Sequence, residues 1–209
     1  VELAYSLYRQ GHSIRSMTYS SCPPAIGVEI IDRPDCSAHN SVVLNYLLDQ
    51  PGIANIVMAA YFPGVVNKPD TAAGMRESVR RLVAANRNVF IVAPTPHEAN
   101  GDLPRRLVRT GDFSISKAQY ETRNSETIAF LGRLKKEGAT ILWPADYLCA
   151  QGQCSATIEG RPVLFDSHHT SQYAADFLAK RFASVIWPDD AGASQLTPAQ
   201  EGPEHIATN

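Results

Sequence analysis

The chain of 209 residues has no long hydrophobic run. No stretch approaches the roughly 20 apolar residues that a membrane-spanning helix needs, so no such helix is expected in it. The chain also lacks an excess of charge of either sign. Its formal net charge is −2 and no basic stripe is interleaved with aromatic residues, which argues against a nucleic-acid partner. The one basic cluster, Arg105, Arg106 and Arg109, is interpreted as a solvated loop. A composition of 44% hydrophobic and 19% charged residues is typical of one large globular domain.

Cysteine is scarce, and its four copies fall into two close pairs, Cys22 with Cys36 and Cys149 with Cys154. Four cysteines allow three connectivities, of which the two local closures need the least long-range coincidence. The even number and close spacing favour disulfides and therefore an oxidising compartment. Two alternatives stay open. One is buried free thiols in a cytosolic protein; the other is a zinc site that combines the second pair with two adjacent histidines further along the chain. Adjacent histidines rarely reach one tetrahedral ion, so zinc is the weaker alternative and no metal is expected.

Apolar residues follow helical spacing in some segments and strand spacing in others. Helices are predicted over residues 1–10, 41–50, 70–86, 115–137 and 171–182. Strands are predicted over residues 13–19, 54–62, 88–94, 139–144 and 161–166. The polar stretch 94–114 is predicted to be a long loop, and residues 188–209 a loose tail. Strands that alternate with helices favour an α/β fold with a parallel sheet and helices on both faces.

The segment "LFDSHHTS", residues 164–171, holds a carboxylate, two histidines and three hydroxyls. In a turn that leads into a helix, Asp166 and His169 lie close together, so the carboxylate can accept the Nδ1 proton of His169. Nε2 then faces outward as a general base that can deprotonate a serine hydroxyl. The alternative is a surface pair at a helix start, where the helix dipole favours Asp. His168 is interpreted as a bystander beside this pair.

The stretch "CAQGQCSATIEGRPVLFDSHHTSQYAADFLAKRF", residues 149–182, resembles the C-terminal block of SGNH hydrolase-like domains that are fused to membrane-bound acyltransferases. That block has a cysteine pair, a short strand, Asp-x-x-His, one or two small polar residues and a helix. Asp166, His169 and Ser171 match it here. A second landmark is "SSCPP" followed by Cys36. The resemblance covers about residues 1–187 and leaves 188–209 as a polar tail.

This resemblance implies a three-layer, flavodoxin-like parallel sheet and a periplasmic or other extracytoplasmic location, with a tether to the inner membrane through an absent N-terminal region. It implies a partner, an integral membrane acyltransferase domain in the same polypeptide. The implied reaction is the transfer of an acetyl or similar acyl group to a carbohydrate acceptor, such as lipopolysaccharide O-antigen. It further implies a Ser-His-Asp triad, with His169 as base and Asp166 as its orienter, and no cofactor. A carbohydrate esterase and a non-catalytic carbohydrate-binding remnant remain alternatives.

The sequence departs from the family in having no Gly-Asp-Ser motif. The family's serine lies in a Gly-Asp-Ser-His block at the end of the first strand, directly before the first helix, and here the first predicted helix begins at Val1. We therefore expect the natural protein to continue upstream, with the first strand and the nucleophile just before Val1, and the chain alone to be inactive. Its start at Val and its lack of a signal-like segment fit a processed product or a fragment. A missing first strand predicts unpaired neighbouring strands.

The oxyanion hole is a second departure. Wider relatives use a Gly of the second block and an Asn of the third, but the third block here reads "AAYFPG". The backbone N–H groups of Ser21 and Ala60 are the candidate replacements. Ser20 and Ser21 are alternative candidates for a replacement nucleophile. This is the weaker alternative, because a loop serine beside a disulfide is more often a turn residue.

Overall fold

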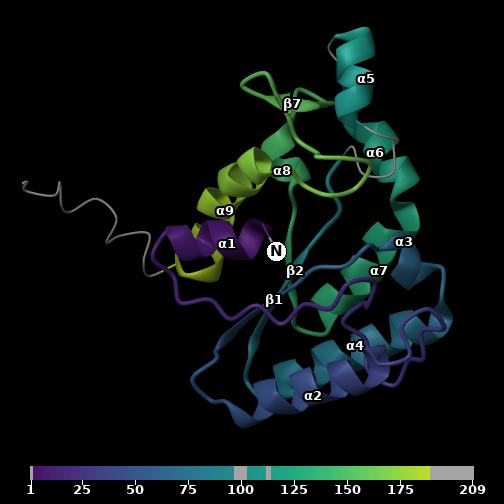
Figure 1. Cartoon of the computed structure of the whole chain (residues 1–209), viewed down its shortest axis with the longest axis vertical. Coiled ribbons are helices and arrows are strands. Elements are labelled where there is room, and N and C mark those ends of the chain that lie inside the picture. The colour runs from purple at the N-terminus through teal and green to yellow at the C-terminus, as the bar shows by residue number, and fades with distance from the viewer. Residues whose placement is uncertain (1, 97–102, 112–113, 189–209) are drawn as a thin grey trace, which may run out of the picture.

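A parallel sheet of three strands forms the middle layer of the molecule (Figure 1). The computed structural model describes residues 2–96, 103–111 and 114–188. The strands are β1 (Asn55–Met58), β2 (Asn88–Val92) and β4 (Thr140–Leu142), in the order β1-β2-β4. Helices cover both faces, so the predicted α/β fold with a parallel sheet is confirmed. The polar tail predicted over 188–209 lies, apart from its first residue, outside the described residues.

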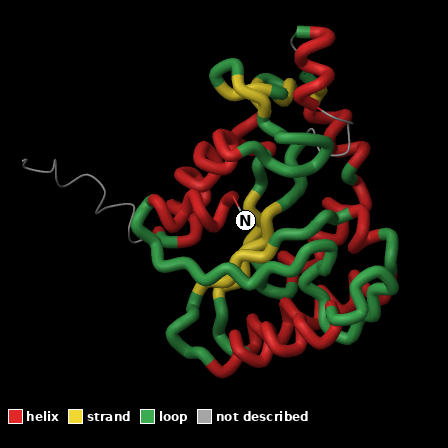
Figure 2. Tube along the Cα trace, in the orientation of Figure 1, coloured by secondary structure: helices red, strands yellow, loops and turns green. Residues whose placement is uncertain are grey.

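The remaining elements surround this sheet (Figure 2). The helices are α1 (Glu2–Arg9), α2 (Cys36–Asp49), α3 (Pro63–Val66), α4 (Pro69–Ala84), α5 (Leu103–Thr110), α6 (Lys117–Arg123), α7 (Ser125–Lys136), α8 (Ala145–Leu148) and α9 (Gln172–Ile186). Short strands form two antiparallel ladders, β3-β6-β5 and β7-β8, from β3 (Ile115–Ser116), β5 (Cys149–Ala150), β6 (Gln153–Cys154), β7 (Thr157–Ile158) and β8 (Arg161–Pro162). None of the helices in the described residues is long and apolar enough to cross a membrane.

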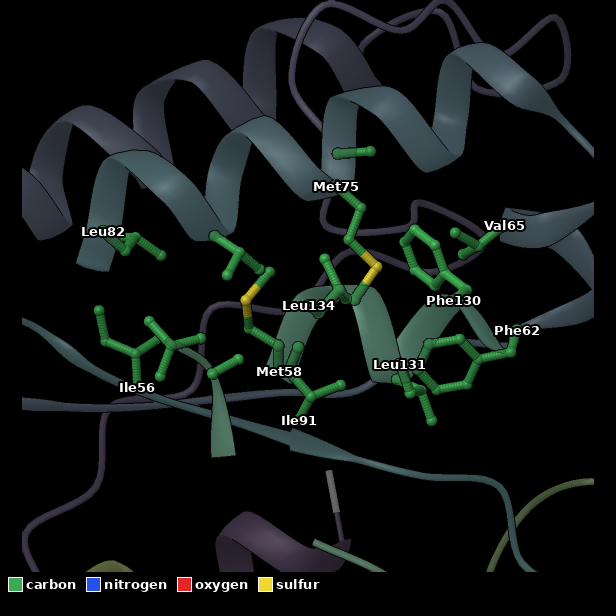
Figure 3. Close-up of a cluster of buried hydrophobic side chains, with 14 of the residues drawn as sticks. Ile56, Met58, Phe62, Val65, Met75, Leu82, Ile91, Phe130, Leu131 and Leu134 are labelled. Carbon is green, nitrogen blue, oxygen red and sulfur yellow. The ribbon is translucent and has the colours of Figure 1, made fainter. Parts of the chain in front are cut away.

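Neighbouring residues of the central strands supply two different cores, because successive side chains of a strand point to opposite faces. On one face Ile56 and Met58 of β1 and Ile91 of β2 pack against α4 and α7 (Figure 3). On the other face Phe90 of β2 packs against α1 and α9, where Phe182 is buried. β2 is therefore covered on both sides, which explains why it reads as a continuous apolar run rather than as an alternating one, whereas Val57 of β1 is exposed.

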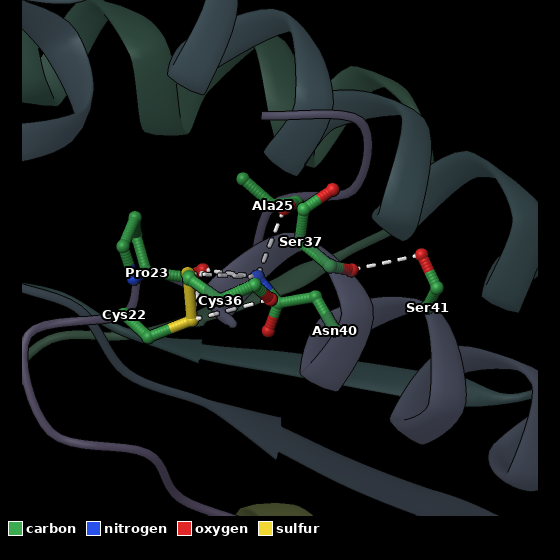
Figure 4. The surroundings of a disulfide bond; sticks show 7 residues. All are labelled: Cys22, Pro23, Ala25, Cys36, Ser37, Asn40 and Ser41. Carbon is green, nitrogen blue, oxygen red and sulfur yellow. Dashed lines mark hydrogen bonds between the residues drawn. A yellow bond between two sulfur atoms is a disulfide. The ribbon is translucent and has the colours of Figure 1, made fainter. Parts of the chain in front are cut away.

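Both cysteine pairs close locally, as Cys22–Cys36 and Cys149–Cys154. The first disulfide fixes the loop before α2, and the Asn40 side chain holds that loop by donating to the carbonyl of Pro23 at 2.8 Å and that of Ala25 at 2.9 Å (Figure 4). The sequence predicted that this helix begins near residue 41. It begins five residues earlier, because the disulfide-bonded half-cystine forms its first turn and Asn40 bonds the loop instead of capping the helix.

Three further predicted elements differ from the structure. Residues 13–19 were predicted as a strand, but they join none of the strand ladders found in the described part of the chain. The segment 94–114 is not a continuous loop: it includes α5, although residues 97–102 and 112–113 within it are outside the described part. The predicted helix 115–137 is instead β3 followed by two helices that meet at Asn124.

The last difference concerns residues 161–166, predicted as the last strand of the main sheet. Only Arg161–Pro162 is a strand, and it pairs antiparallel with β7 outside that sheet. The hairpin closes at Gly160, whose positive φ of 75° suits a tight turn. The segment that carries Asp166 therefore reaches the sheet as a loop and not as a strand.

A close contact at Gly74 gives a stability test of the packing between α4 and the disulfide-bonded loop. A Cβ at this position would lie 2.3 Å from the carbonyl oxygen of Ile26, a backbone atom that cannot swing away. We expect Gly74→Ala to lower the free energy of unfolding by about 1–3 kcal/mol, as overpacking does elsewhere.

The matched control is Gly132→Ala in α7, where an added Cβ meets nothing within 4 Å. Helix propensity alone should make that variant more stable by roughly 0.5–1 kcal/mol. Urea unfolding of both variants measures the two effects, and a Gly74→Ala protein as stable as the native one would contradict the contact.

Candidate active site

Asp166 and His169 form a hydrogen-bonded pair in the loop before α9. The distance from His169 Nδ1 to Asp166 Oδ2 is 2.7 Å. The other carboxylate oxygen, Oδ1, accepts the backbone N–H of His168 at 2.9 Å and that of His169 at 2.8 Å. The carboxylate is thus held on both oxygens, and the imidazole cannot rotate away from it without losing its partner.

The charge state of Asp166 decides which nitrogen of His169 is the base. Backbone hydrogen bonds from His168 and then His169 hold the pKa of the Asp166 carboxyl well below its usual range. An ionised carboxylate only accepts hydrogen bonds, so the proton between the two side chains lies on Nδ1 of His169. Nε2 then carries a free lone pair, and with 62% of the side chain exposed this nitrogen is open to a reacting group.

His168 does not share this geometry. Its Nδ1 is 2.8 Å from the Ser167 hydroxyl and 3.9 Å from the Asp166 carboxylate, too far for a hydrogen bond. Its ring lies 5.4 Å from that of Tyr61 and 4.2 Å from that of His169. The side chain therefore packs beside the pair as a neighbour.

The loop is compact because its two ends are tied together. Leu164 and Thr170 form an isolated antiparallel bridge, and the backbone N–H of Phe165 donates to the carbonyl of His169 at 2.7 Å. Directly after it, the Ser171 hydroxyl accepts the N–H of Ala174 and caps α9. The closed loop and the capped helix together fix the distance in space between the Asp166 and His169 side chains.

The loop folds back over the carboxyl ends of the parallel strands. A cavity of about 310 Å³ is lined by His169 together with residues that follow β1, β2 and β4, among them Ala60, Thr95 and Pro144. Ligands of open α/β sheets bind at this edge. The loop therefore lies at the edge where ligands of such sheets bind, although it comes from outside the main sheet.

The amino-terminal end of α1 also opens into this cavity, which Glu2 and Leu3 help to line. Buried Ser6 holds that helix against α9: its Oγ lies 2.6 Å from Asp176 Oδ1 and accepts from Gln172 Nε2 at 3.0 Å. Arg9 pairs with the same carboxylate and, with Ser6 and Gln172, lowers the pKa of Asp176. The start of α1 is thus fixed near His169.

The sequence did not identify this link between α1 and α9. Its signal is present, since Gln172 and Asp176 are polar residues four apart and therefore on the same face of α9. Their partners on α1 lie more than 160 positions away in the chain. No local pattern connects two such distant segments.

The two candidate oxyanion donors lie in different places. Ala60 lines the cavity that contains His169. Ser21 is exposed, adopts the left-handed region at φ 58°, and is not among the residues that line that cavity. The geometry brings Ala60 to the site and leaves Ser21 in the turn beside the first disulfide.

A metal site has little support in the described residues. Asp166, His168 and His169 have ligand atoms within 4.8 Å of one another, on an exposed loop. Cys149 and Cys154 are joined in a disulfide and have no thiolate to offer, so the zinc alternative that combined them with the histidines is wrong. The positions of the three loop residues are fully explained by the hydrogen bonds of the acid–base pair.

Comparison with known proteins places the chain in a family. The periplasmic domain of a lipopolysaccharide acetyltransferase of Salmonella ser. Paratyphi A has a similar structure, with a TM-score of 0.65 and 14% sequence identity over 88% of this chain and 77% of that one. No curated protein matches the sequence significantly. The family model for the SGNH domain (fused to AT3 domains) matches residues 2–184. That match spans nearly the whole described chain, and the protein therefore belongs to the family of SGNH domains that are fused to AT3 domains.

Proposed function

We propose that this domain transfers an acyl group, most simply acetyl, to a hydroxyl of a cell-surface polysaccharide such as O-antigen. The observation that carries the proposal is the 2.7 Å contact between His169 Nδ1 and Asp166 Oδ2 at the carboxyl edge of the sheet. Membership of a family fused to AT3 domains supports acyl chemistry, with the membrane acyltransferase in the same polypeptide as donor partner. The similar lipopolysaccharide acetyltransferase domain supports a polysaccharide acceptor.

The proposed location is periplasmic or otherwise extracytoplasmic. Two disulfides among the described residues suit an oxidising compartment, and the similar acetyltransferase domain is periplasmic. The tether to the inner membrane is assigned to sequence that precedes Val1. Residues 1–187 make up the catalytic domain in this proposal, with a polar tail after them.

The nucleophile in this mechanism is a serine that precedes Val1. Its Oγ attacks the carbonyl carbon of the acyl donor while Nε2 of His169 takes the hydroxyl proton, and Asp166 stabilises the imidazolium that forms. The backbone N–H of Ala60 faces the oxyanion. His169 then gives the proton to the leaving group. In the second half, a sugar hydroxyl loses its proton to Nε2 and attacks the acyl-serine. His169 then returns that proton to the departing serine Oγ, which frees the serine as the new ester forms.

Ester hydrolysis is the second candidate function. It differs in a single step, in which water instead of a sugar hydroxyl attacks the acyl-serine. The exposure of the His169 side chain favours this alternative, because nothing in the described structure keeps water from Nε2. A polysaccharide acceptor that lies over the loop would exclude that water, so acceptor dependence separates the two reactions.

His169→Ala tests the base. In the protein that includes the residues preceding Val1, we expect kcat/KM for a chromogenic acetyl ester to fall by about 10²–10⁴-fold, the range that general base catalysis supplies. His168→Ala is the matched control from the adjacent position and should leave kcat/KM close to the native value. Equal losses of kcat/KM in the two variants, or no loss in His169→Ala, would contradict the assignment of His169 as the base. Radiolabelled acetyl on added polysaccharide, measured in the same samples, distinguishes transfer from hydrolysis.

Asp166→Asn tests the orienter. The amide can donate to Nδ1 and so favours the tautomer with the proton on Nε2, which should lower kcat by up to about 10⁴-fold.

The same variant tests the pH dependence of stability. The folded pKa of Asp166 lies below its unfolded value of about 3.9, so its ionisation stabilises the fold above that pH. This contribution is lost as the pH falls through the folded pKa. The native protein and Asp166→Asn should therefore differ in stability at neutral pH and converge below about pH 4. Thermal unfolding across this range checks the stability, and full activity in Asp166→Asn would contradict the role.

A further inference from the structure

Tyr61 is an exposed aromatic residue at the cavity that contains His169. It lies in the loop between β1 and α3, lines the cavity, and is 51% exposed. The next residue, Phe62, is fully buried and packs in the core beside Leu131 (Figure 3). The loop is thus anchored by one aromatic side chain, and it presents the adjacent one at the site.

The ring of Tyr61 has contacts that fix its position. A Cβ added at Gly64 of α3 would lie 3.6 Å from Cδ1 of Tyr61, so the ring lies beside Gly64 with room for no more than a methyl group between them. The Gly64 N–H also donates to the Tyr61 carbonyl at 3.0 Å. The His168 ring has its centroid 5.4 Å from that of Tyr61 and 4.2 Å from that of His169. Tyr61 is therefore a fixed ring that is separated from the base by one other ring.

Phe165 is a second exposed ring near the base. It is 73% exposed, although Leu164 before it is fully buried. Its N–H donates to the carbonyl of His169 at 2.7 Å, directly after the bridge between Leu164 and Thr170. Phe165 and His169 therefore oppose each other across the closed loop, and opposed residues of an antiparallel pair have Cβ atoms roughly 5 Å apart. Two exposed aromatic residues from different segments, Tyr61 and Phe165, thus lie near His169.

The charges at this cavity are negative. Among the described residues that line it, Glu2 is the one acidic residue, and none is a lysine or an arginine. Asp166, which is ionised beside His169, adds a second negative charge. An anionic ligand at this place would meet like charges and no lysine or arginine to pair with, which is costly. The lining therefore favours an uncharged ligand.

We propose that Tyr61 and Phe165 form a stacking subsite for an uncharged pyranose unit of the acceptor polysaccharide, next to the unit whose hydroxyl reaches His169. The face of an aromatic ring carries negative charge density, so the C–H groups on the apolar face of a pyranose ring pack favourably against it. The inference rests on the proposed function for one point, that the bound sugar is the acceptor of the acyl group.

The subsite would act on the reaction from a distance. A sugar unit stacked on the two rings holds its neighbour close to Nε2, and this positioning favours attack by the sugar hydroxyl. The same sugar chain covers the His169 side chain, which is otherwise open to water, and so favours transfer over hydrolysis. Acetyl esters of small alcohols have no unit that could occupy the subsite.

Oligosaccharide binding tests the subsite without reference to turnover. A microarray of neutral hexose and deoxyhexose oligosaccharides, with oligogalacturonates of equal length as its acidic members, is probed with the protein that includes the residues preceding Val1. We expect neutral members to bind and oligogalacturonates not to bind. Calorimetric titration with the neutral member that binds most strongly should then give a dissociation constant about tenfold higher in Tyr61→Ala and in Phe165→Ala.

Two further variants separate stacking from other effects. Tyr61→Phe keeps the ring and loses the hydroxyl, so its dissociation constant should stay close to the native value. Tyr8→Ala is the matched control, because Tyr8 is 61% exposed on α1 but does not line the cavity that contains His169. It should also bind like the native protein. Thermal unfolding of each variant shows that the fold is intact.

Four outcomes would overturn the inference. They are a preference for oligogalacturonates, no binding of any neutral member, equal dissociation constants in Tyr61→Ala, Phe165→Ala and Tyr8→Ala, and a loss of affinity in Tyr61→Phe as large as that in Tyr61→Ala. Ester turnover of the native protein is measured in parallel. Binding of neutral members without turnover would retain the subsite and end the proposed mechanism, and turnover without such binding would retain the mechanism and end the subsite.

Discussion

β1 pairs with β2 along one edge, and among the described residues no strand pairs with its other edge. This constraint leaves one side of the sheet open. The segment Ser13–Tyr19 lies across a cavity of about 760 Å³ from β1, and residues of α1 and α2 also line that cavity.

The same constraint connects the fold to the chemistry. His169 and Asp166 are held rigidly by the closed loop, with the proton assigned to Nδ1 and Nε2 free. The start of α1 is held near them by Ser6 and Asp176. A base and its orienter are thus built entirely from the described residues, and in our proposal the serine that they act on precedes Val1.

The sequence predicted much of this arrangement and missed the parts that depend on distant segments. The apolar run at Ile56 and the spacing of Asp166 and His169 are local signals, and both predicted the structure well. The run 13–19 looked like a strand because its pattern suits one, but a strand also needs a neighbour, and a pattern cannot show whether the neighbour is present. The position of Ala60 relative to Ser21 likewise depends on how the loops pack, which no local spacing reports.

In the proposed mechanism, residues before Val1 supply the serine that completes the triad with His169 and Asp166. A crystal structure of the protein with those residues tests this mechanism most directly, through the distance between the serine Oγ and Nε2 of His169. We predict a distance of about 3 Å, within hydrogen-bond reach. A serine beyond hydrogen-bond reach of His169 would contradict the mechanism.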